Sequence, residues 1–70
     1  MMVVASELSK YIGKPVGVMS GLDAFGGELM GVEKLADGLI KAVLFYDDDI
    51  DMRTYILTLD PDKTVDIMED

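Results

Sequence analysis

The sequence of 70 residues contains no cysteine and no histidine. Because these residues are the commonest nucleophiles, general bases and soft-metal ligands, the usual catalytic and zinc sites are excluded. Ser6, Ser9 and Ser20 also have no basic residue at a recognisable catalytic spacing. We therefore expect a protein that is not an enzyme and that holds neither a cofactor nor a metal ion.

Basic residues are scarce, since six Lys and Arg oppose fourteen Asp and Glu and give a formal charge of −8. This charge repels polyphosphate and anionic lipid at long range. No apolar run approaches the roughly 20 residues of a membrane-spanning helix, and the first ten residues lack the pattern of a signal peptide. The missing cysteine also suits a reducing compartment. We expect a soluble, cytoplasmic protein that does not bind membranes.

The length allows one small domain, which we expect to cover residues 1–70. A domain of this size buries a modest core, and no disulfide supports it, so self-association is an expected source of additional stability.

The N-terminal part of the sequence has the pattern of a short amphipathic α-helix over about residues 4–12. Its apolar residues follow the i, i+4, i+7, i+8 spacing of one helical face, namely Val4, Leu8, Tyr11 and Ile12. Gly13 and Pro15 then stop the helix, because glycine adopts the left-handed end conformation and proline cannot continue a helix.

From Pro15 onward, short apolar segments alternate with turn residues, which predicts five strands over residues 15–20, 25–35, 39–46, 53–59 and 64–68. Glycines in the second segment indicate bulges or sharp bends. Asp37-Gly38 and the segment from Asp60 to Lys63 are typical hairpin turns. The third segment is apolar throughout and should be covered on both faces. The predicted fold is mainly β, with the helix followed by a strongly bent, five-stranded antiparallel small barrel over about residues 15–68.

Four segments also carry family-like motifs: Gly13 to Val16 (GKPV), Phe25 to Glu33 (FGGELMGVE), Glu33 to Asp37 (EKLAD) and Tyr55 to Asp60 (YILTLD). In this order they resemble the motifs "LGKPV", "F-x-G-x-L-x-G-φ-D", "D-x-φ-M-N" and "V-φ-I-R-G-D/N" of the Sm/LSm superfamily. The resemblance covers most of the chain and implies an Sm-like (SH3-like) barrel. It also implies a homo-oligomeric ring of about five to seven subunits that binds single-stranded RNA or DNA.

The chain departs from the family pattern at the positions that read the base. Ala36 and Asp37 replace Met and Asn, and Thr58 and Leu59 stand where the family has Arg and Gly. The family uses that Asn and Arg to contact uracil, so the resemblance implies the fold more strongly than a preference for uridine.

The resemblance implies a nucleic-acid-binding site in two loops, formed by Lys34, Leu35, Asp37, Thr58 and Asp60. Lys34 would contact a phosphate, Leu35 would pack on a base, and the other three would hydrogen-bond base edges. The alternative is that Asp37 only forms the hairpin turn and Thr58 only fills a strand.

Two edges of a five-stranded barrel carry unpaired backbone groups. Pairing of the fourth strand with the fifth strand of a neighbouring subunit would satisfy both edges head to tail and close a ring. We expect the buried interface residues to come from Tyr55, Ile56, Val65 and Ile67.

Two alternatives stay open at this point. The acidic run Asp47, Asp48, Asp49 and Asp51 suits a Ca²⁺ or Mg²⁺ site in residue type, but the EF-hand spacing is absent and a solvated hairpin tip explains the run better. The chain also resembles PRC-barrel modules, which have short bent strands and "GKPV"-like openings. That resemblance implies a small structural or regulatory protein-interaction barrel without a nucleic-acid ligand.

Overall fold

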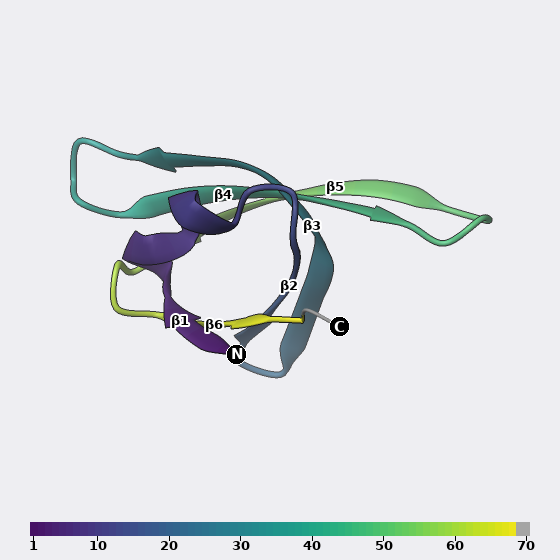
Figure 1. The fold of residues 1–70 in the computed structure, drawn as a ribbon, viewed down its shortest axis with the longest axis horizontal. Helices are drawn as coiled ribbons and strands as arrows, with labels where there is room; N and C mark the ends of the chain where they lie inside the picture. The colour runs from purple at the N-terminus through teal and green to yellow at the C-terminus, as the bar shows by residue number, and fades with distance from the viewer. Residues whose placement is uncertain (69–70) are drawn as a thin grey trace.

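The computed structural model describes residues 1–68, so the last two residues of the expected domain lie outside the described part (Figure 1). Seven elements follow one another along the chain. They are β1 (Met2–Val4), the 3₁₀ helix η1 (Ala5–Tyr11), β2 (Pro15–Ser20), β3 (Asp23–Lys34), β4 (Ile40–Asp47), β5 (Met52–Leu59) and β6 (Thr64–Ile67).

The six strands form one sheet in the order β1-β6-β2-β3-β4-β5, and all neighbouring strands are antiparallel. The sheet curves around a single interior, and the tip of the β4–β5 hairpin extends away from it (Figure 1). Within residues 1–68, β1 and β5 are the two edges and do not pair with each other. The mainly β, strongly bent character is thus confirmed, in a sheet that does not close.

Each of the five predicted strands is present, with ends within two residues of the expected positions. The count of five is wrong, because Met2–Val4 forms a sixth strand against β6. The predicted helix is present within one residue of the expected bounds, but it is a 3₁₀ helix and not an α-helix. Val4 pairs with Thr64 in the sheet, and the backbone amide of Ala5 donates to the carbonyl oxygen of Lys63 at 2.8 Å, so partners far along the chain fix the first residues of the helix.

The core lies on the inner face of the sheet, where η1 also packs. Leu29 of β3 and Leu44 of β4 are directly opposite each other and have no exposed surface. The other buried apolar residues are Ala5, Leu8, Val16, Val18, Ile40, Ala42, Leu59, Val65 and Ile67. Burial of these side chains is the main favourable term in the stability of so small a domain.

The burial of β4 differs from the prediction. β4 is central, since it pairs with β3 and β5, but its residues alternate between a buried and a half-exposed face. Val43 and Phe45 lie on the half-exposed face. The prediction that this strand is covered on both faces is therefore wrong for the single chain, because η1 and the curved sheet cover only the inner side.

Candidate functional site

The fold brings the two predicted binding loops to the same end of the sheet. Lys34 is opposite Ile40, and Ile40 is opposite Leu59, so β3 ends beside the start of β4 and the end of β5. The loop at residues 35–39 and the turn at residues 60–63 consequently lie at the same end of the molecule (Figure 1).

Local hydrogen bonds determine the shape of the first loop. The amide of Leu35 donates to the carbonyl oxygen of Leu39 at 2.8 Å, and the amide of Leu39 donates to Oδ1 of Asp37 at 3.0 Å. Gly38 has a φ of 88°, which favours glycine. Asp37 therefore forms the turn, as the simpler alternative expected, and one of its carboxylate oxygens already accepts a backbone hydrogen bond. Lys34 is exposed and Leu35 is half-buried.

Thr58 lies apart from this group. It is opposite Lys41, which is opposite Glu33, and directly paired residues share one face of a sheet. Lys41 and Glu33 form a long ion pair at 3.9 Å on the outer face. Lys34 belongs instead to the row of Ile40, which faces inward, so Thr58 and Lys34 point to opposite sides of the sheet.

The electrostatics of the two loops are mixed. The two loops and the residues next to them in sequence include two lysines, Lys34 and Lys63, and three aspartates, namely Asp37, Asp60 and Asp62. The turn itself is well anchored, because the amide of Lys63 donates to the carbonyl oxygen of Asp60 and the amide of Ser6 in η1 donates to that of Pro61. The site offers a few local cationic and apolar contacts on a rigid frame, without a positive surface.

The four predicted interface residues divide into two pairs. Ile56 is 63% exposed on the edge strand β5, and Tyr55 is half-buried against Phe25, with ring centroids 5.2 Å apart. Val65 and Ile67 are core residues with at most 1% exposure. Their strand is not an edge either, because β6 pairs with β1 on one side and with β2 on the other.

A polar cavity of about 350 Å³ lies on the β4–β5 hairpin, and sequence reasoning did not identify it as a unit. Tyr46 and Tyr55 line it together with Asp48, Asp51 and Arg53. Arg53 is ion-paired with Asp51, and the hydroxyl of Tyr46 donates to Oδ2 of Asp48 at 3.4 Å. The negative charge of Asp48 is the main reason why the pKa of Tyr46 is raised. The residues that line this cavity thus already pair with one another.

The acidic run forms the tip of this hairpin, and the carboxylates of Asp47 and Asp48 accept backbone hydrogen bonds. Oδ1 of Asp47 accepts from the amide of Asp49 at 3.2 Å, and Oδ1 of Asp48 accepts from the amides of Ile50 and Asp51 at 3.1 and 2.7 Å. In the described chain no three Asp or Glu side chains are grouped so that they could hold a metal ion. The carboxylates of the tip act as turn formers.

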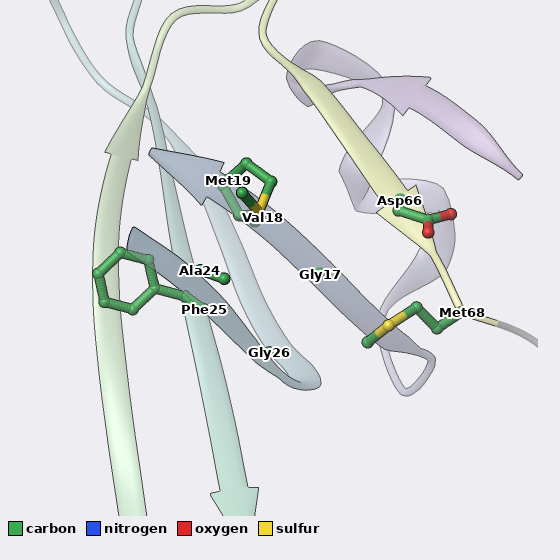
Figure 2. Close-up of a pocket in the computed structure, with 8 residues that line it drawn as sticks. All are labelled: Gly17, Val18, Met19, Ala24, Phe25, Gly26, Asp66 and Met68. Carbon is green, nitrogen blue, oxygen red and sulfur yellow. The ribbon is translucent and has the colours of Figure 1, made fainter. Parts of the chain in front are cut away.

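An apolar cavity of about 320 Å³ on the outer face of β6, β2 and β3 was also missed (Figure 2). Its floor contains Gly17 and Gly26, and Met19 and Met68 lie at its sides. Phe25 also lines it, but the ring of Phe25 packs against Tyr55. One sequence signal was available: Gly17 alternates with the buried Val16 and Val18, which places a glycine on the exposed face of a strand.

A second missed signal is the methionine content. All six methionines are exposed, by 45% to 69%: Met1, Met2, Met19, Met30, Met52 and Met68. Methionine is a flexible, polarisable side chain that is common on surfaces that bind other proteins. Met19 and Met68 line the apolar cavity described above, whereas Met30 and Met52 do not.

No known protein family matches the chain. Comparison with characterised proteins gives no match, and the same is true of comparison with solved structures. Over residues 1–68, the structure contains no helix with the length and apolarity to cross a membrane.

Proposed function

We propose that this chain is a non-catalytic, Sm-like cytoplasmic protein that assembles into a homo-oligomeric ring and binds single-stranded RNA or DNA. The observation that carries the proposal is the common row of Lys34, Ile40 and Leu59, which brings the two motif-bearing loops to one end of the sheet. Repeated around a ring, this end would present each subunit's Lys34 and Leu35 to the same strand of nucleic acid.

In this proposal β5 pairs across the ring contact with β1, whereas the sequence led us to expect pairing with the last strand, β6. β5 is a free edge of eight residues, and Lys and Pro, which often protect edge strands, are absent from it. The opposite edge is β1, because β1 covers β6. Head-to-tail pairing would therefore join β5 to β1 of the next subunit, with Ile56 beside the contact and Tyr55 on the inner face.

The −8 charge determines the expected character of nucleic-acid binding. Few counterions are released when a strand contacts isolated lysines such as Lys34 and Lys41, so the salt dependence should be shallow. Leu35 and the aromatic residues would supply apolar and stacking contacts. Since Thr58 replaces the arginine of the resembled motif and faces away from Lys34, uridine preference should be weak or absent.

The test combines mass and affinity measurements. Size-exclusion chromatography with light scattering at micromolar concentration should give the mass of a closed oligomer. Titration with short oligo-U, oligo-A and single-stranded DNA at two salt concentrations should show modest binding with little base preference. A monomeric mass would contradict the ring, and absence of binding to every strand at low salt would contradict the nucleic-acid ligand.

The exposed methionines favour a second candidate, a PRC-barrel-like protein-interaction barrel that has no nucleic-acid ligand. Binding measurements distinguish the two candidate functions. The interaction barrel should bind no oligonucleotide in the titration above, yet it should retain a partner protein when the folded chain is immobilised.

A further inference from the structure

A strip across the outer face of β6, β2 and β3 carries few side chains of its own. Asp66 is opposite Gly17, and Gly17 is opposite Gly26, so two of three neighbouring positions carry no side chain. Met68 lies over this strip: a Cβ at Gly17 would be 3.3 Å from its sulfur, and a Cβ at Gly26 would be 3.8 Å from its Cε. We call this cavity, with Met19 at its side, the glycine–methionine groove (Figure 2).

The size of the groove is sufficient for one large apolar side chain. Its volume of about 320 Å³ is at the lower end of the range for ligand pockets. One large apolar side chain would fill it and contact the backbone of both glycines. Met19 and Met68, which are 59% and 45% exposed, can adjust their rotamers to such an insertion.

Acidic residues flank the groove at both ends. One adjoining depression shares Gly17 and Met19 with it and includes Met2, Asp62, Lys63 and Asp66. The other shares Gly26 and Met68 with it and includes Glu28 and Asp47. The two depressions therefore contain four carboxylates and one side-chain ammonium group, that of Lys63. One of the four, the Asp66 carboxylate, also forms an ion pair at 3.3 Å with the terminal amine of Met1.

We propose that the glycine–methionine groove docks a basic amphipathic segment of a partner protein. The segment would insert one large apolar side chain over Gly17 and Gly26 and would place Lys or Arg side chains near Asp62 and Asp66. Charge complementarity selects this occupant, because the acidic flanks repel nucleic-acid phosphates and attract Lys and Arg side chains. The inference does not depend on nucleic-acid binding by the loops, although Asp62 belongs to the turn at residues 60–63.

The NMR signals of the methionine methyl groups test the proposal, because each signal reports binding at a known position in the structure. The probe is a synthetic amphipathic peptide with Leu and Trp on one face and Lys on the other, added to the full chain labelled at its methionine methyl groups. The signals of Met19 and Met68 should shift saturably, whereas those of Met30 and Met52, which do not line the groove, should not. A matched peptide with Glu in place of Lys should bind at least about tenfold more weakly.

Two pairs of variants locate the site. In Gly26→Leu the new Cβ lies at ordinary contact distance from its neighbours and the side chain fills the groove, so peptide binding should weaken at least about tenfold. In the control Gly31→Leu the new Cβ has nothing within 4 Å, and peptide binding should not weaken. The double variant Asp62→Asn/Asp66→Asn should weaken binding about threefold to tenfold. Its control, Glu7→Gln/Asp49→Asn, removes the same number of charges away from the groove and should leave the affinity unchanged.

Several results would overturn the proposal. These are equal binding of the Glu peptide, shifts at Met30 and Met52 in place of Met19 and Met68, or unchanged affinity in a folded Gly26→Leu variant. Met19 and Met68 shifts caused by protein concentration alone would assign the groove to a second copy, and shifts caused by oligo-U would assign it to nucleic acid. The peptide comparison uses the unmodified chain, so it decides the question even if Gly26→Leu does not fold.

Discussion

Gly27 of β3 passes so close to Phe45 of β4 that a Cβ on Gly27 would lie 2.6 Å from the carbonyl oxygen of Phe45. Gly27 also has a φ of 159°. The atom in the way belongs to the backbone of a central strand, so it cannot move aside as a flexible side chain does. This close approach accompanies the bend of β3, whose register against β4 shifts between Leu29 and Gly31.

Gly27→Ala should therefore destabilise the fold by about 1–3 kcal/mol, the usual range for an overpacked core position. Urea unfolding followed by circular dichroism measures this change. Gly31→Ala is the control, because nothing lies within 4 Å of its Cβ position. It should be neutral or stabilising by up to about 1 kcal/mol. Equal stability of the two variants would show that β3 and β4 are not this close.

Leu44→Ala should lower the free energy of unfolding by about 2–5 kcal/mol, because it removes a fully buried side chain opposite Leu29. In a domain this small, such a loss is a large part of the total stability. Leu22→Ala provides the comparison, since Leu22 is fully exposed at the β2–β3 turn and its truncation should have little effect. Urea unfolding measures both variants. A loss below about 1 kcal/mol for Leu44→Ala would contradict the assigned core.

The Asp48 carboxyl group should titrate below its usual pKa of 3.8, because the amides of Asp51 and Ile50 donate to its ionised form. Since folding lowers this pKa, the stabilising contribution is complete above the unfolded-state pKa and is lost as the pH falls through the folded-state pKa. NMR titration of the Asp48 carboxyl carbon measures the midpoint, and the same titration of the urea-unfolded chain is the reference. A folded-state midpoint at or above the unfolded one would exclude these hydrogen bonds in solution.

In the proposed ring, Ile56→Lys should shift the assembly toward monomer. The substitution places a charge on the free edge strand β5, where natural edge strands use lysine to prevent pairing. Ile50→Lys is the matched control, since Ile50 is 95% exposed at the hairpin tip and its replacement adds the same charge away from the edge. Light scattering over a range of concentrations compares the two variants. An unchanged mass for Ile56→Lys would remove β5 from the assembly contact.

Lys34→Glu should weaken single-strand binding about tenfold or more in the assembled protein, because the lost phosphate contact recurs in every subunit. Lys10→Glu produces the same net charge at an exposed position of η1, outside the two loops, and should have a much smaller effect. Fluorescence anisotropy with labelled oligo-U and single-stranded DNA measures both. If strong, uridine-selective binding survives Lys34→Glu, the nucleic-acid site lies elsewhere.

The sequence by itself determined the five longer strand assignments and the turns that join them. Alternating apolar residues in β2 and β5, the Asp37-Gly38 turn and the turn from Asp60 to Lys63 act through neighbouring residues, so their effect is visible in a local pattern. The sequence also indicated the bend of β3, since glycines within a strand have few other uses.

Only the tertiary structure decided which segments meet. Met2–Val4 has no strong pattern of its own and becomes a strand because β6, from the other end of the chain, offers it hydrogen bonds. That pairing converts β6 from an edge to an interior strand and leaves β1 and β5 as the edges. The same holds for Gly17 and Asp66: they lie side by side because β2 pairs with β6 from the other end of the chain. Long-range pairing and register depend on the whole sheet, and a local sequence pattern cannot specify them.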